Sequence, residues 1–240
     1  MSESPTSAAR PRRRHSARGR QARRRLKQAA LECLEELGYH RMRVADVTRR
    51  AGVATGLFYH YFSDLKTLVV EVLEEFLARF EDTAHIERNI ARGDWFGRIL
   101  AHYTQIVSAY ARHPGLMRCI TQLTDEDAEF RALWRRSYQR QLKQLVVVMP
   151  RLFPESRLSD AQNWLMVYAL GDIGEGLLRE YYIEHSPEVR RFELSEEEMA
   201  EWLAVVFYRG LFLVHPPAER LRHSRRILAI GRDREAVTAS

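Results

Sequence analysis

Val44-Ala-Asp-Val-Thr-Arg-Arg-Ala-Gly-Val-Ala-Thr-Gly-Leu-Phe-Tyr-His-Tyr-Phe62 is the stretch that decides the fold of this chain. Its apolar residues form two short helical patterns that meet at Gly52, a residue able to adopt the positive φ of a tight turn. A helix, a tight turn with glycine and a second helix together make a helix-turn-helix. A dense arginine block lies just upstream, and a compact second helix beside concentrated positive charge is suited to reading a DNA groove.

The charge of the chain is unevenly distributed along its 240 residues, although the net value is only +6. Residues 1–68 hold 15 Lys/Arg against 6 Asp/Glu, whereas residues 69–217 hold 17 against 23. The segment from Arg10 to Lys27 contains ten Lys/Arg and no acidic residue. This polarity predicts a polyanionic partner for the N-terminal part of the chain only.

Apolar residues spaced three and four apart predict helices along most of the chain. The predicted helices span residues 20–37, 44–51, 54–60, 64–85, 95–112, 114–122, 125–148, 159–184 and 195–214. Proline or glycine interrupts the pattern between them, and one such break is expected from Met149-Pro150 to Pro154. No segment alternates as a strand would, so we expect an all-α fold.

The pattern divides the chain into four parts. Residues 1–17 lack apolar periodicity and are expected to be a disordered basic tail. A helix-turn-helix DNA-binding domain of three helices should occupy residues 18–68, and a long fourth helix should join it to a larger helical domain over residues 69–217. A basic C-terminal tail is expected over residues 218–240.

Several classes of protein are disfavoured by what the sequence lacks. No apolar run is long enough for a membrane span, and no apolar stretch follows the basic N-terminus as in a signal peptide. Cys33 and Cys119 lie in apolar helical patterns, as small core residues of a reduced cytosol do. No glycine-rich phosphate loop or Gly-x-Ser-x-Gly elbow occurs. We therefore expect a cytoplasmic protein that is not an enzyme and holds neither a cofactor nor a metal.

At residues 51–62 the chain resembles the TetR family of transcriptional regulators. The residues that carry the resemblance are, in order, Gly38, Tyr39, Val44, Val47, Gly52, Val53, Gly56, Tyr59, Tyr61, Phe62 and Leu68. The resemblance covers about residues 20–70. It implies a ligand-responsive repressor whose homodimer binds a palindromic DNA operator, with one recognition helix per half-site, and is released by a small, mainly apolar effector.

The chain departs from the family pattern in three regions. Met42 and Arg43 stand where a threonine is common, so the second helix lacks its usual N-cap hydroxyl. Ala54 replaces a serine or threonine that would bind phosphate. The usual lysine at the start of the fourth helix is shifted by one position to Lys66, so Arg43 and Lys66 would have to supply phosphate contacts.

The candidate DNA-binding residues follow from side-chain chemistry and from the resemblance. Thr55 has a hydroxyl and a methyl group with which to read a base edge, and Leu57 faces either thymine methyls or the core. Tyr59 matches the family tyrosine that grips a phosphate, and His60 can donate to a phosphate or a base. The remaining candidates are Gly56, where the backbone approaches DNA closely, and the backbone-contact residues Arg23, Arg24, Arg43 and Lys66. Phe58 and Phe62 are expected to pack inside.

The larger domain should bind the effector and form the dimer, as the resemblance implies. Aromatic residues recur along its helices, either as core or as the lining of an apolar pocket: Trp95, Tyr103, Tyr110, Trp134, Tyr138, Trp164 and Tyr168. Glycines within the last two long helices indicate close helix approach, at a dimer seam or beside a ligand. The dimer candidates are Gly174, Leu178, Trp202, Val206, Phe207, Gly210 and Leu213.

Two other functions remain open from the sequence. The arginine-rich segment over residues 10–25 could drive nonspecific nucleic-acid binding, with no part for the helix-turn-helix. The chain could also be a helical small-molecule-binding protein or enzyme that keeps a vestigial helix-turn-helix.

Overall fold

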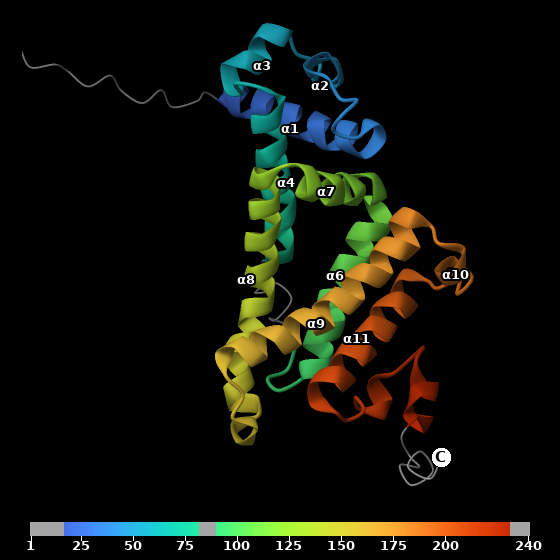
Figure 1. Ribbon diagram of the computed structural model, residues 1–240. Coiled ribbons are helices and arrows are strands. Elements are labelled where there is room, and N and C mark those ends of the chain that lie inside the picture. The colour runs from blue at the N-terminus through green and yellow to red at the C-terminus, as the bar shows by residue number, and fades with distance from the viewer. Residues whose placement is uncertain (1–16, 82–89, 231–240) are drawn as a thin grey trace, which may run out of the picture.

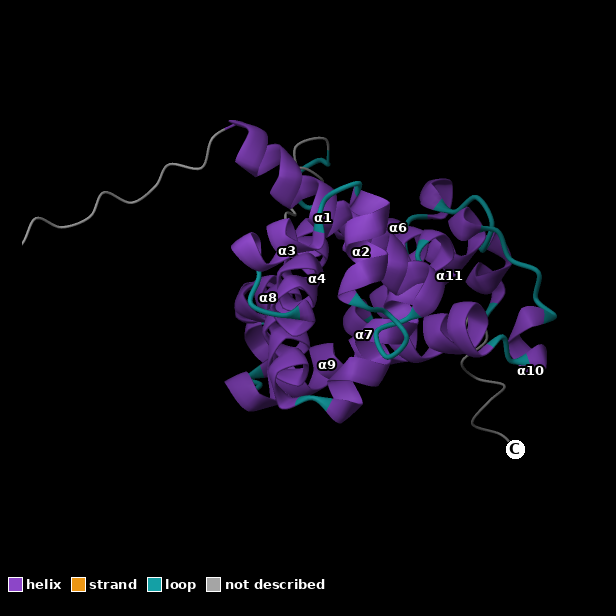
Figure 2. Cartoon of the chain, turned by 90° about the horizontal axis from the view of Figure 1, so that it is seen from above, coloured by secondary structure: helices purple, strands orange, loops and turns teal. Residues whose placement is uncertain are grey.

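The helix-turn-helix forms as its sequence predicts. In the computed structural model, which describes residues 17–81 and 90–230, the first four helices are α1 (Ala17–Leu37), α2 (Val44–Ala51), α3 (Thr55–Tyr61) and α4 (Leu65–Glu81). All regular structure within these ranges is helical, which confirms the all-α fold (Figure 2). Most of the predicted tail over residues 1–17 lies outside the described residues.

Apolar side chains from all of these helices meet in one small core. Leu26 and Leu34 of α1 are completely buried, as are Val47 of α2 and Phe58 of α3. Gly52 ends α2 with φ 60°, and its N–H donates to the carbonyls of the last turn. Because a side chain at that φ would be strained, glycine is what lets α3 follow α2 at once.

The larger domain lies below this module (Figure 1). Its helices are α6 (Trp95–Arg112), α7 (Pro114–Glu126), α8 (Ala128–Leu152), α9 (Asp160–Arg179), α10 (Pro187–Arg190) and α11 (Glu196–Phe212). Helix α4 runs down beside α8, α7 crosses beneath α1, and α6 packs closely against α11. None of the described helices has the length and apolar content that a membrane crossing requires.

The break predicted from Met149-Pro150 to Pro154 begins later than expected, because α8 continues through Pro150 to Leu152. Proline costs a backbone hydrogen bond, but only two helical residues follow Pro150, so little of the helix depends on that bond. The long helix predicted over residues 159–184 is correct in extent but not in form. Helix α9 ends at Arg179, and a π-helical turn (Glu180–Glu184) completes it.

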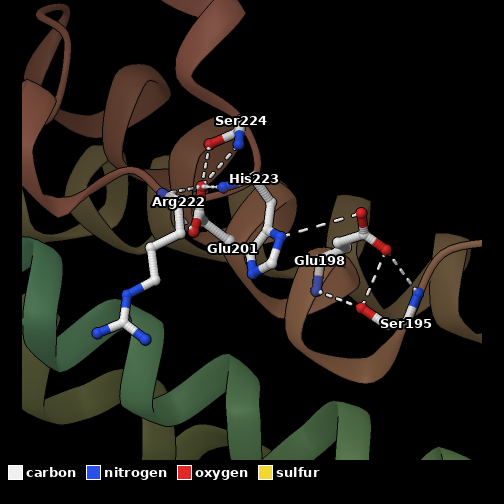
Figure 3. A network of polar contacts seen from close by, with 6 residues as sticks. All are labelled: Ser195, Glu198, Glu201, Arg222, His223 and Ser224. Carbon is white, nitrogen blue, oxygen red and sulfur yellow. Dashed lines mark hydrogen bonds and ion pairs between the residues drawn. The ribbon is translucent and has the colours of Figure 1, made fainter.

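The C-terminal segment over residues 218–230 lies against α11, although the sequence predicts a tail there. Its anchor is the buried carboxylate of Glu201, which accepts hydrogen bonds of 2.6–3.1 Å from the backbone N–H groups of Arg222, His223 and Ser224 and from the Ser224 hydroxyl (Figure 3). Leu221 and Ile227 are buried beside this network. The segment therefore belongs to the folded domain.

The hydrogen bonds determine the protonation state of Glu201. Burial by itself would raise the pKa of this carboxyl, but the bonds from the Ser224 hydroxyl and the three backbone N–H groups outweigh burial and hold the pKa below its ordinary value. An acid whose pKa is lower in the folded chain than in the unfolded chain stabilises the fold when the pH is above its unfolded-state pKa. This stabilisation is lost as the pH falls through its folded-state pKa.

We expect Glu201→Gln to lower the midpoint of thermal unfolding by about 5–10 °C at neutral pH. A neutral amide cannot accept from four donors, and its own NH₂ group meets backbone N–H groups. The exposed Glu197 provides the matched control, and Glu197→Gln should leave the midpoint within about 1 °C. The difference in unfolding midpoint between Glu201→Gln and the wild type should become smaller once the pH falls below about 4. If this difference stays constant or grows in acid, the stabilisation does not come from an ionised Glu201.

Candidate nucleic-acid interface and helical-domain cavity

Helix α3 presents a solvent-facing surface of mixed chemistry. Thr55, Tyr59 and His60 are exposed, Leu57 is half-buried, and Phe58 faces the core. A Cβ added at Gly56 would meet no atom within 4 Å, so the backbone there is open to an approaching partner. The structure therefore places the predicted base-reading residues together on one outward surface, with Leu57 at its margin.

The arginine block extends this surface along α1. A groove of about 470 Å³ between α1 and α4 is lined by basic residues that include Arg20, Arg24 and Arg79. Arg24 is exposed, whereas Arg23 forms an ion pair with Glu71 of α4. Of the two arginines of α1 that are predicted to contact DNA, Arg24 is thus the one whose described contacts include no acidic side chain.

Arg43 and Lys66 are engaged within the protein. The Arg43 guanidinium donates to the carbonyl oxygens of His40 at 2.7 Å and Met42 at 3.0 Å, so it covers the backbone before α2. The Lys66 amine lies 2.7 Å from Asp127 Oδ2 and 3.1 Å from Glu129 Oε2 at the start of α8. The hydrogen bond to Asp127, and then that to Glu129, raises the pKa of Lys66. Lys66 thus faces the larger domain.

A second contact joins the module to the larger domain. The Glu35 carboxylate of α1 accepts from the backbone N–H groups of Gly115 at 2.8 Å and Leu116 at 2.7 Å, in the first turn of α7. These N–H groups have no partner within α7, and the helix dipole favours an anion there. A Cβ at Gly115 would lie 2.1 Å from the Glu35 carbonyl oxygen, so the close approach requires glycine.

A cavity of about 260 Å³ lies among α6, α8, α9 and α11. Of the predicted pocket aromatics, Trp95, Tyr103 and Tyr138 line it. Tyr110 and Trp134 line a neighbouring cavity of about 350 Å³. Trp164 and Tyr168 line neither; Tyr168 packs edge-on against Tyr138, with ring centroids 5.3 Å apart, and Trp164 packs on Tyr168.

Sequence reasoning missed the polar residues of this cavity, chiefly His102, Gln141 and Glu175. A signal was present for Glu175, which follows Gly171 by four residues and so shares its helix face. Burial lowers the pKa of His102 to about 4, so this imidazole is neutral at physiological pH. Burial raises the pKa of Glu175; the hydrogen bond from Tyr110 opposes this shift, and the nearby charge of Asp172 adds to it.

The predicted dimer residues divide between the inside and the outside of the domain. Gly174, Leu178 and Phe207 are buried: a Cβ at Gly174 would lie 2.8 Å from the Tyr103 ring, and the other two line the cavity. Helix periodicity alone does not say which apolar face turns inward. The candidates outside the interior are Trp202, Val206, Gly210 and Leu213, of which Val206 and Leu213 are exposed and Trp202 and Gly210 half-buried.

Helix α9 adds an exposed apolar row that the sequence prediction did not include. Leu165 is 71% exposed and Ile173 is 53% exposed, and Ala169 lies between them on the same face. Helices α9 and α11 are neighbours, because a Cβ at Gly210 would lie 2.4 Å from the Leu170 side chain. The outward apolar rows of the two helices therefore lie on adjacent elements.

An all-α chain with an exposed helix-turn-helix on a larger helical domain has the architecture of a DNA-binding transcriptional regulator, and comparisons agree. Residues 26–72 match the profile of the family described as bacterial regulatory proteins, tetR family. The HTH-type transcriptional regulator BetI of Escherichia coli is 38% identical over 60 residues, which make up 25% of this chain and 31% of BetI. Over residues 26–72 the chain carries the helix-turn-helix domain that TetR-family transcriptional regulators share.

Solved structures show that the likeness of fold extends to the larger domain. The fatty acid degradation regulator FadR from Bacillus halodurans is similar over 81% of this chain and 97% of its own, with a TM-score of 0.61 and 18% identity. A TetR-like transcriptional regulator from Rhodococcus sp. RHA1 is similar over 80% and 96%, with a TM-score of 0.58 and 16% identity. At these identities the comparison concerns the fold alone.

We expect Lys66→Gln to leave the salt dependence of binding to a random-sequence DNA duplex unchanged, because Asp127 and Glu129 already neutralise the amine. Arg24→Gln, which removes the same charge from the exposed block, should lower the slope of log affinity against log salt by about one. Fluorescence anisotropy across a salt series measures both slopes. An equal drop for the two variants would show that Lys66 contacts phosphate.

Proposed function

We propose that this chain is a transcriptional repressor that binds a palindromic operator as a homodimer and leaves it when a small, mainly apolar effector binds. The protein acts in the bacterial cytosol, at the nucleoid. The observation that carries the proposal is the outward surface of α3, where Thr55, Tyr59 and His60 stand exposed on a rigid small core. Side chains of this kind read base edges and phosphates when their helix enters a major groove.

The homodimer is supported by the outward apolar rows of α9 and α11. Exposed large residues such as Leu165, Ile173 and Val206 on neighbouring helices form the kind of surface that isologous interfaces bury. A two-fold axis through this surface would place the two α3 helices symmetrically, which is why the operator is expected to be palindromic.

Release by an effector is supported by the position of the cavity. Glu175 lines this cavity and accepts a hydrogen bond from Tyr110, which lies near the end of α6, a few residues before Gly115. The N–H group of Gly115 donates to Glu35 of the small module. A ligand that moves the end of α6 therefore acts on a direct contact to the DNA-binding module. In the dimer, such a ligand shifts the population from the arrangement whose two small modules fit the major groove to one whose modules are differently spaced. It does so provided that it binds the second arrangement more tightly than the first.

Selection from a random-sequence duplex pool should return a palindrome with half-sites one or more helical turns apart. Against that site, Thr55→Ala should lower affinity by about 1–3 kcal/mol and relax the preference at one base position. Tyr59→Phe should weaken all sequences alike, as the loss of a phosphate contact does. Gel shifts at moderate salt measure both effects. Only salt-sensitive binding without sequence preference would overturn the proposal.

Removal of residues 1–17 distinguishes sequence-specific binding by the helix-turn-helix from nonspecific binding by the arginine-rich segment. The shortened chain should keep its sequence preference and lose only a salt-dependent part of its affinity. If the preference disappears together with these residues, the helix-turn-helix is not the reader.

We expect Ile173→Glu to convert the dimer to a monomer, because it places a charge within the outward apolar row of α9. Val147→Glu is the matched control: Val147 is exposed to a similar degree, but it lies on α8, outside that row. Sedimentation analysis at micromolar concentration distinguishes the two species. A wild-type chain that sediments as a monomer, or dissociation by both variants, contradicts the proposed interface.

A further inference from the structure

One end of the larger domain's cavity carries a carboxylate. Glu175 of α9 lines both this cavity and the neighbouring one, and its Oε2 accepts a hydrogen bond of 2.6 Å from the Tyr110 hydroxyl. Within residues 17–81 and 90–230, no lysine, arginine or histidine forms an ion pair with Glu175. A carboxylate removed from water without a cationic partner is costly, so an incoming positive charge would be strongly favoured.

The walls near Glu175 suit a cation of low hydration. Tyr103, Tyr138 and Phe207 line the same cavity, and the Tyr103 and Phe207 rings meet edge to face, with centroids 6.0 Å apart. Aromatic faces attract cations through the ring quadrupole, most strongly where water is excluded. Neutral His102 adds no opposing charge.

Helical glycines bring two of these tyrosines close to α9. A Cβ at Gly171 would lie 2.4 Å from the Tyr138 hydroxyl, and one at Gly174 would lie 2.8 Å from the Tyr103 ring. Both positions precede Glu175 on α9, Gly171 by about one helical turn and Gly174 directly, so larger residues would push the rings away from the carboxylate. The glycines therefore hold the aromatic walls against the acidic end of the cavity.

The basic side chain that lines the cavity belongs to its other end. Arg98 of α6 stacks on Trp95, with its guanidinium carbon 5.3 Å from the ring centroid. Arg98 precedes Tyr110 by twelve positions, which separates their attachment points by about 18 Å along the helix axis. A ligand with a single positive head at Glu175 and an uncharged tail toward Arg98 is compatible with both ends. A ligand with a second positive charge on its tail is not compatible with the end of the cavity that Arg98 lines.

We propose that the effector is an organic monocation, an amine or a quaternary ammonium with an apolar tail, and that Glu175 is its counter-ion. This inference rests on the proposed function only in assigning the effector to this cavity. An anionic head would be repelled by Glu175. A neutral head would gain at most a hydrogen bond, without the charge pairing that offsets the burial of the carboxylate.

Three probes with the same six-carbon tail test the head group: hexyltrimethylammonium, hexanoate and 1-hexanol. Titration calorimetry on the full chain, in the absence of DNA, should show saturable binding of the ammonium at one site per protomer. Its affinity should exceed that of the other two by at least tenfold. No saturable ammonium binding, or equal affinity for 1-hexanol or hexanoate, overturns the proposal.

Glu175→Gln should lower the affinity for hexyltrimethylammonium at least tenfold and leave that for 1-hexanol within twofold. Glu184→Gln is the matched control, since Glu184 is an exposed acid just beyond α9, and it should change neither affinity beyond twofold. Unchanged ammonium binding in Glu175→Gln overturns the assignment of the counter-ion. If that variant does not fold, the three probes on the wild-type chain decide alone.

Gel shifts on the selected operator keep this inference separate from the proposed function. Sequence-specific DNA binding by a protein that rejects hexyltrimethylammonium overturns the cationic effector and leaves the regulator intact. Loss of sequence-specific binding overturns the regulator, whatever the calorimetry shows.

Discussion

The Glu35 carboxylate binds the free N–H groups at the start of α7, and the position of the DNA-binding module depends on this contact. The first turn of a helix carries unpaired donors and a partial positive charge, so a carboxylate from another helix is held there firmly. Gly115 makes the approach possible, because any side chain there would collide with the backbone of α1. The module is therefore attached by the end of α1, and α3 is left free on the opposite side (Figure 1).

A second attachment of opposite polarity stabilises the same arrangement. Lys66 at the start of α4 pairs with Asp127, whose Oδ1 also accepts from the Glu129 N–H group at 2.9 Å and so caps α8. The module thus contacts the first turns of both α7 and α8. Because α7 follows α6 almost directly, a displacement of α6 reaches the module through Gly115, without passing through the rest of the domain.

The cavity and the outward dimer surface belong to opposite faces of the same two helices. On α9, Gly174 and Leu178 face inward while Leu165 and Ile173 face outward; on α11, Phe207 is inside and Val206 outside. A ligand that separates α6 from α9 therefore acts on helices that also build the proposed dimer. In a homodimer, this geometry couples occupancy of the cavity to the spacing of the two small modules.

Much of the fold was predictable because its signals are local. Helical periodicity predicts every long helix, and Gly52 marks the turn because only glycine adopts its conformation without strain. The start of α11 was likewise predictable, since Ser195 and Glu198 form a capping box from adjacent residues. Pro150 shows the limit of such rules, because its effect depends on how much helix follows it.

The candidate site was predictable only where one helix forms it. The residues of α3 come together because they share a short helix whose other face, with Phe58, packs into the core. The partner of Lys66 lies 61 residues away, so no spacing rule identifies it as a bridge to α8. Glu201 reads in the sequence as one more acid of a charged helix start, yet it anchors a segment that otherwise resembles a basic tail.

By itself the sequence determined the helices, the helix-turn-helix and the concentration of positive charge beside it, because periodicity, glycine conformation and charge are properties of neighbouring residues. Only the tertiary structure decided which face of α9 and α11 lines a cavity, which arginines remain at the surface, and that Glu175 lies in an aromatic pocket. Those outcomes depend on packing between segments far apart in the chain, where burial and charge pairing, and not local spacing, select the arrangement.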